Sequence, residues 1–246
     1  LSSKLHFFSG DSYTMNDYSG FSDNFGRETQ FVGENSSIDC EIKYLLPKRH
    51  TFGKMTFEIH DMDGQLLAKL GAGKSKGINI VNWNYTIKQP KIAKGKTFSF
   101  GGFTSPRVAA GTYKAVIKKG RDTYEKEFDV VYDKNTGLNS DERKMQYKVV
   151  MKMYNMVQDL AYLVYELDAI VKDEKTSKKT ASKLNELKET LVITTGDNYV
   201  GTAKRQLREK MADLYSKIAS SYDKPSENEL NNLSLIEDEF NRAKSK

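Results

Sequence analysis

The 246-residue chain has few of the residues from which catalytic and metal sites are usually built. It contains one cysteine, Cys40, which excludes an internal disulfide and a cysteine-based zinc site. Its three histidines, at positions 6, 50 and 60, do not have the spacing of a metal-binding pair. No run approaches the roughly 18 apolar residues of a transmembrane helix. We therefore expect no catalytic residue, no metal and no cofactor, and a chain that is not an enzyme.

The chain opens at Leu1 and has no charged segment followed by an apolar run, which would mark a leader. We expect it to be a fragment or a processed product.

Acidic residues are also missing from a long central part. No Asp or Glu occurs from Gly64 to Arg121, a span that contains ten lysines and two arginines. The span could form a basic face for a polyanion such as an acidic glycan, lipopolysaccharide or nucleic acid. Alternatively, its lysines occupy outer positions and are balanced in space by acids elsewhere. Nucleic acid is disfavoured because the span has scattered lysines rather than arginines interleaved with aromatic residues. The candidate polyanion contacts are Lys88, Lys91, Lys94, Lys96 and Arg107.

Apolar and polar residues alternate from Ile38 to Tyr44, as expected of a half-buried strand. Similar runs occupy 55–59, 66–70, 78–83, 113–117 and 124–132. Asp63-Gly64 is typical of a tight hairpin turn. Several short strands at this spacing predict a β-sandwich over residues 35–136, with 88–108 as a long connection or irregular edge. Residues 1–34 are predicted to be an irregular, aromatic-rich lead-in whose rings pack on another surface.

The composition changes near Asp133–Ser140, after which Lys, Glu, Leu, Met and Ala dominate. Apolar residues then recur at alternating spacings of four and three, which predicts a helix from Ser140 to about Glu174. Shorter stripes predict helices over 181–191, 203–218 and 226–240. The last begins with Ser226 and Glu229, spaced as a capping box. Three or four helices closing into an antiparallel bundle over 137–246 make the fold class α+β, all-β and then all-α.

Four features invite a functional interpretation beside a structural one. Trp83 could stack on a glycan, but we expect it in the core with its ring N–H hydrogen-bonded. Cys40 lies on the apolar face of its strand and is expected to be a small buried residue. His60 and Asp61 could form a base and its orienting group in a hydrolase, or a polar pair at a strand end. Asp61 and Asp63 could bind calcium, but the hairpin turn explains both.

Several segments between Phe31 and Asp133 resemble a known pattern. They are FVGENSS, IDCEIKYLL, KMTFEIHDMDGQLLAKL, KGINIVNWN and AAGTYKAVI. Their order resembles the Ig-like region that follows the β-propeller in bacterial sortilin-like, neuraminidase-repeat proteins of the Bacteroidetes type, often described as glycosyl-hydrolase-like. The spacing Gly77-x-Asn79-x-Val81-x-Trp83 is also similar to the Ig-like domain of flagellar hook-capping proteins. The chain departs from the pattern at Ser36 and Ser37, where the family usually has prolines, and in residues 91–103, which are unmatched.

The resemblance implies an Ig-like, fibronectin-type β-sandwich followed by a mostly helical tail. It implies a non-catalytic scaffold or protein-interaction portion at the C-terminus of a larger exported β-propeller protein, in the periplasm or on the cell surface. The expected partner is then the propeller itself or an envelope complex, and any hydrolase activity belongs to the propeller. The alternative is a carbohydrate- or polyanion-binding module that uses residues 64–121, and a hydrolase fragment is a lesser one. Neither nucleic acid nor a membrane span is expected.

Overall fold

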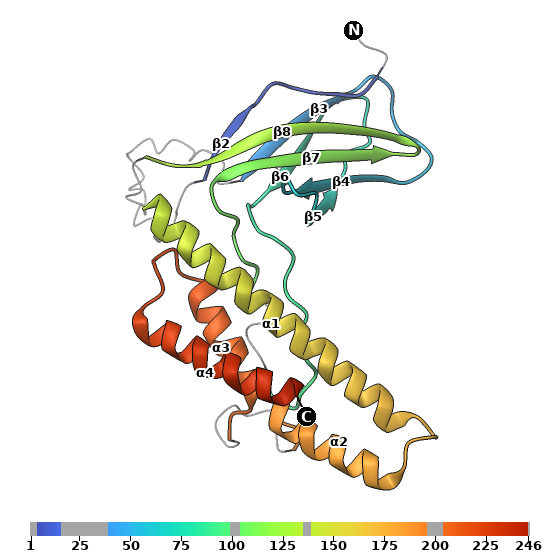
Figure 1. Cartoon of the computed structure of the whole chain (residues 1–246). Helices are drawn as coiled ribbons and strands as arrows, with labels where there is room; N and C mark the ends of the chain where they lie inside the picture. The colour runs from blue at the N-terminus through green and yellow to red at the C-terminus, as the bar shows by residue number, and fades with distance from the viewer. Residues whose placement is uncertain (1–3, 16–38, 99–103, 135–138, 196–203, 246) are drawn as a thin grey trace, which may run out of the picture. The chain divides into compact units, whose positions relative to one another are not determined.

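The computed structural model describes residues 4–15, 39–98, 104–134, 139–195 and 204–245. The chain is an α+β protein with two compact units (Figure 1). The sheet unit comprises Leu1–Ile87 and Val108–Ser140, and the helical unit comprises Lys88–Arg107 and Asp141–Lys246. The described residues of the segment 88–107 thus belong to the helical unit, although the segment lies between two strands of the sheet unit in the sequence.

The sheet unit contains two sheets. The three-stranded sheet has the order β1 (His6–Phe7), β3 (Cys40–Leu46) and β6 (Gly77–Trp83). The five-stranded sheet has the order β2 (Ser12–Met15), β8 (Asp122–Tyr132), β7 (Gly111–Lys119), β4 (Met55–His60) and β5 (Leu66–Gly71). All neighbouring strands in these sheets are antiparallel except β2 and β8, which are parallel.

The two sheets pack face to face through large aromatic side chains. Trp83 of the three-stranded sheet lies 5.8 Å from Tyr113 and 6.1 Å from Phe128 of the five-stranded sheet, between ring centroids. Tyr44 and Phe57 make a second ring contact between the sheets, at 6.2 Å. The alternation along β3 and β6 places every second residue in this core, which explains why these segments form strands. The arrangement is sandwich-like, and its Ig-like type stays a prediction.

The lead-in contains two short strands that the sequence pattern did not indicate. In β1, His6 pairs with Leu45, and β2 pairs with β8. Strands of two and four residues are too short to show an alternating sequence pattern. Their strand conformation depends on pairing with neighbouring strands. The ring of Phe7 packs edge-on against Tyr44 and Phe57, so at this position an aromatic of the lead-in lies against the sheets. The remaining residues of the predicted lead-in, 1–3 and 16–34, lie outside the described part.

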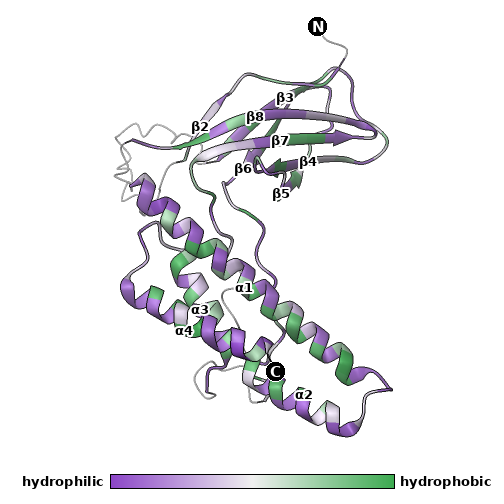
Figure 2. Cartoon of the chain, viewed as in Figure 1, coloured by the Kyte–Doolittle hydropathy of each residue, from purple (hydrophilic) through white to green (hydrophobic). Residues whose placement is uncertain are grey.

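The helical unit contains α1 (Ser140–Lys172), α2 (Lys178–Leu191), α3 (Leu207–Ala219) and α4 (Glu227–Lys244). Each helix has hydrophobic and hydrophilic residues, as Figure 2 shows, and α3 packs against α4. In α1 most of the predicted apolar stripe is buried, including Met153, Leu160 and Leu167, but near its C-terminal end Ile170 is 47% exposed. The predicted capping box begins α4, because Ser226 and Glu229 hydrogen-bond each other's backbone N–H groups.

No described helix has both the length and the apolar content needed to cross a bilayer.

Candidate functional site

A groove on the helical unit combines tyrosine rings with lysine side chains. It has a volume of about 710 Å³. We call it the tyrosine–lysine groove; its lining residues are Lys91, Ile92, Lys94, Ala161, Tyr162, Val164, Tyr165, Asp168, Ala169 and Lys172. A hollow of this size is typical of sites for small ligands.

Helix α1 forms one wall of the groove, and residues 91–94 form the other. Tyr162, Tyr165 and Lys172 share one face of α1, because residues three, four and seven apart lie above one another on a helix. Tyr162 is 47% exposed and Tyr165 is 73% exposed, so both rings are available for contact. The ammonium of Lys91 lies 5.2 Å from the ring centroid of Tyr162, which is a cation–π distance.

The groove has an excess of positive charge. Its only lining carboxylate, Asp168, forms an ion pair with Lys188 of α2. No described carboxylate lies within ion-pair distance of Lys94 or Lys172. Exposed tyrosine rings can pack on the faces of sugar rings, and ammonium groups bind carboxylate, sulfate or phosphate. The groove is therefore suited chemically to an acidic sugar or a similar anion with a flat apolar part.

The five lysine and arginine positions predicted from the sequence lie in three different surroundings. Lys91 and Lys94 line the groove, whereas Lys88 and Lys96 are exposed outside it. Arg107 is half-buried with its guanidinium 5.3 Å from the ring centroid of Tyr222, and its carbonyl accepts a hydrogen bond from Arg143. Arg107 is thus engaged in packing within the helical unit.

Sequence reasoning missed the part of the groove that comes from α1. Tyr162 and Tyr165 lie off the predicted apolar seam. Large aromatic residues on the outer side of a helix were the one sequence signal that could have indicated a binding surface there. Nothing in the sequence indicated that Lys91 and Lys94 would lie beside them, because about 70 residues separate the two walls along the chain.

Trp83 and Cys40 lie in the core of the sheet unit, as expected. The indole of Trp83 is 1% exposed, and its ring N–H donates to the carbonyl of Thr86 at 2.8 Å. Cys40 is fully buried, and burial raises the pKa of its thiol. A buried thiol with a raised pKa is a poor nucleophile.

His60 contacts a different carboxylate from the one predicted. Its Nε2 lies 3.2 Å from Glu58 Oε2, and its Nδ1 lies 3.1 Å from the carbonyl of Gly64. Asp61 instead accepts the backbone N–H of Gln65 and so closes the turn after β4. Burial alone would raise the pKa of Glu58, but hydrogen bonds from Lys118 and His60 lower it more, so this pKa lies below its ordinary value. Glu58 is thus an ionised anchor for neighbouring cations.

Among the described residues, no group of three or more His, Cys, Asp or Glu side chains could hold a metal ion.

Comparisons with known proteins found distant likenesses to solved structures. No family model and no curated protein matches the chain. Part of it is similar in structure to PorZ, an essential bacterial surface component of the type-IX secretion system of Porphyromonas gingivalis. That match has 19% sequence identity and a TM-score of 0.21, and it covers 37% of this chain and 9% of PorZ. Another solved structure, CopC from Methylosinus trichosporium OB3b, is similar at 14% identity and a TM-score of 0.23, over 40% of this chain and 80% of CopC.

Proposed function

We propose that this chain is a non-catalytic module for contact with other macromolecules. In this proposal it is the C-terminal part of a larger exported β-propeller protein of the periplasm or cell surface, and its sheet unit is an Ig-like domain. The segments between Phe31 and Asp133 that resemble the sortilin-like, neuraminidase-repeat proteins support this context. The matching residues Trp83 and Tyr113 serve the core of the sheet unit, which accounts for the motif by packing rather than by catalysis.

The observation that supports a protein partner is an apolar surface on β6. Ile78 and Ile80 point away from the core and are 62% and 52% exposed. Ile78 lies opposite Leu45 of β3, and β6 is an edge strand among the described strands of its sheet. Edge strands usually avoid exposed apolar residues, because such edges pair with other chains. We assign this surface to contact with the propeller of the same polypeptide.

Photo-cross-linking tests the protein contact. A photoreactive residue in place of Ile80, in the intact polypeptide with its upstream sequence, is expected to cross-link to upstream residues several-fold more than one in place of Val131. Val131 is a matched control, since it is also exposed, at 40%, but lies on the five-stranded sheet. Mass spectrometry of the products identifies the partner. Equal yields at the two positions, or an upstream sequence without propeller-type strands, would contradict the proposal.

A second candidate function is the binding of an acidic carbohydrate in the tyrosine–lysine groove. It is supported by the convergence of Lys91 and Lys94 with Tyr162, Tyr165 and Lys172 around one hollow. The lysines would hold carboxylate or sulfate groups, and the rings would pack on the sugar. In this case the acid-free span 64–121 contributes to ligand binding through Lys91 and Lys94 at a defined site on the helical unit, and not as a diffuse charged surface.

Binding to heparin, lipopolysaccharide and a neutral glycan across a salt series tests this second function. The native chain is expected to retain the acidic ligands in a salt-sensitive way. Both Lys94→Gln and Tyr165→Ala are expected to weaken binding about tenfold, the usual effect of losing one charge-assisted hydrogen bond or one aromatic contact. Lys88→Gln removes the same charge from an exposed lysine outside the groove and is expected to have little effect. Equal losses in Lys88→Gln and Lys94→Gln would show diffuse attraction and eliminate the groove.

A further inference from the structure

The sheet unit has a basic pocket of its own, separate in residues from the tyrosine–lysine groove. It has a volume of about 500 Å³. We call it the basic pocket; its lining residues are Lys4, Leu5, Pro47, Lys48, Lys119, Arg121, Asp122, Thr123 and Tyr124. Four of these nine residues are cationic and one is anionic.

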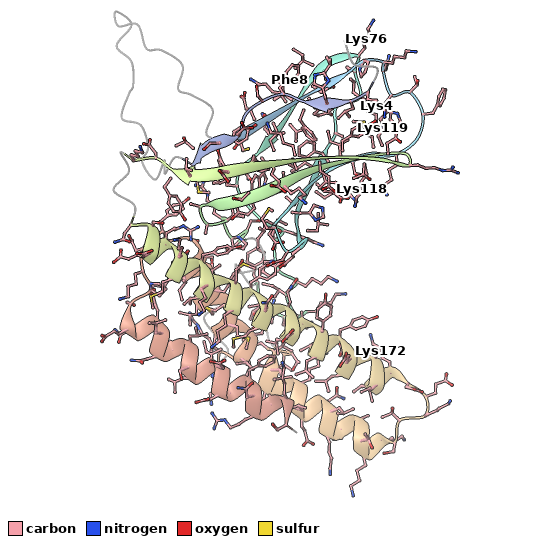
Figure 3. All side chains as sticks on the ribbon, turned by 45° about the horizontal axis from the view of Figure 1, so that its top comes forward. Lys4, Phe8, Lys76, Lys118, Lys119 and Lys172 are labelled. Atoms are coloured by element: carbon pink, nitrogen blue, oxygen red, sulfur yellow. The ribbon has the colours of Figure 1, made fainter. Side chains whose placement is uncertain are left out.

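Three segments that are distant in sequence build the basic pocket. Lys4 precedes β1 and is placed by its neighbour Leu5, which is only 4% exposed. Lys48 follows the end of β3. Lys119 and Arg121 belong to the β7–β8 hairpin, whose two-residue turn has Gly120 at its first position with φ +63°. In Figure 3, Lys4 and Lys119 lie at the same end of the sheet unit.

The charge arrangement in the basic pocket differs from that on the rest of the β7–β8 hairpin. Three lysines of these strands have carboxylate partners: Lys114 with Glu125 at 3.3 Å, Lys118 with Glu58 at 2.7 Å and Lys126 with Asp11 at 3.5 Å. In contrast, no described carboxylate lies within ion-pair distance of Lys48, Lys119 or Arg121. Asp122 is opposite Lys119 in the strand register, but its carboxylate lies beyond ion-pair distance of that lysine.

We propose that the basic pocket binds a phosphate group that belongs to a larger molecule. Lys48, Lys119 and Arg121 gather around one hollow with no described carboxylate within ion-pair distance, and such like charges are stabilised by a multivalent anion. A phosphate monoester has close to two negative charges and several acceptor oxygens, so it can accept from Lys48, Lys119 and Arg121 together. The hydroxyl of Thr123 is a further donor on the lining. The volume leaves room for the sugar or headgroup to which the phosphate is attached.

Site-resolved binding tests this assignment on the whole chain. Inorganic phosphate, a sugar phosphate, and phosphatidylcholine vesicles with and without phosphatidic acid are titrated while amide NMR shifts are followed. We expect phosphate and sugar phosphate to shift residues 4–5, 47–48 and 119–124, and the double variant Lys119→Gln/Arg121→Gln to weaken binding about tenfold or more. Binding should weaken as salt is raised, and less steeply in the double variant than in the native chain. Lys76→Gln is the matched control, because Lys76 is an exposed lysine of the same unit that does not line the basic pocket.

The outcomes separate this site from the tyrosine–lysine groove and from general attraction. Binding of sugar phosphate identifies a soluble or glycan source, and binding only to vesicles with phosphatidic acid identifies a lipid source; each supports the phosphate site. The proposal is overturned if no probe shifts these residues, if the shifts fall only in residues 91–94 and 161–172, or if Lys76→Gln weakens binding as much as the double variant. Circular dichroism of the double variant checks that the fold is retained, which is expected because both side chains lie at the end of a hairpin.

Discussion

Trp83→Ala is expected to lower the free energy of unfolding of the sheet unit by about 3–5 kcal/mol. The indole is 1% exposed and lies within 6.1 Å of the Tyr85, Tyr113 and Phe128 rings, so its removal leaves a large cavity between the sheets. The carbonyl of Thr86 also loses its donor. Urea unfolding measures the change. It is followed by circular dichroism, because the variant lacks the chain's single tryptophan and therefore has no tryptophan fluorescence to follow.

Two variants make the Trp83 result specific. Trp83→Phe keeps an aromatic ring but lacks the N–H donor, and we expect an intermediate loss of about 1–3 kcal/mol. Ile80→Ala removes an exposed side chain from the same strand and should change stability by less than about 0.5 kcal/mol. If Trp83→Ala costs no more than Ile80→Ala, the indole does not fill the core between the sheets.

Arg208→Met is expected to have the largest effect on the helical unit, about 3–5 kcal/mol. Arg208 is 7% exposed; its Nε donates to the carbonyl of Ala93 at 2.6 Å, and one terminal nitrogen donates to the carbonyl and hydroxyl of Thr97, each at 3.0 Å. The same nitrogen forms an ion pair with the buried Glu209 at 2.6 Å. Removing the guanidinium therefore takes a donor from two buried carbonyls and leaves the buried Glu209 carboxylate without its ion-pair partner, with the Thr97 hydroxyl still donating to it. Amide exchange in α3 and in residues 88–98 measures the loss for this unit alone.

Lys210, two residues further along α3, supplies the control for Arg208. Lys210→Met removes the same charge from the same helix, but Lys210 pairs with Glu239 at a partly exposed position, so we expect about 0–1 kcal/mol. The double variant Arg208→Met/Glu209→Gln should recover part of the loss, because it also removes the buried carboxylate charge. A double variant no more stable than Arg208→Met, or a single variant within about 1 kcal/mol of the native chain, would contradict this account.

Local pattern was sufficient for much of the fold. The alternation from Ile38 onward identified β3, and similar runs identified β4 to β8, because a half-buried strand must alternate. The capping box at Ser226 was readable because it depends on residues three apart. Gly64, with φ +84°, forms the turn that Asp63-Gly64 indicated. Strand β2 was not readable, because its parallel partner β8 lies far along the chain.

The candidate sites show the limit of the same reasoning. The acid-free span drew attention to Lys91 and Lys94, but it equally included Lys88, Lys96 and Arg107, which do not line the groove. The composition of a segment shows how many charged residues it contains. It does not show which of them lie near carboxylates in the folded chain. The basic pocket illustrates this most clearly, since Lys4 and Lys48 lie outside the acid-free span altogether.

By itself, the sequence of this protein determined its α+β class, most strand and helix positions, and the burial of Trp83 and Cys40, because these follow from periodicity over a few neighbouring residues. Only the tertiary structure decided that Ala93 and Thr97 bind to α3 through Arg208, and that two separate groups of cations surround hollows. The physical reason is that buried hydrogen bonds and clustered charges involve residues far apart in the chain, and a short-range sequence pattern does not predict such long-range contacts.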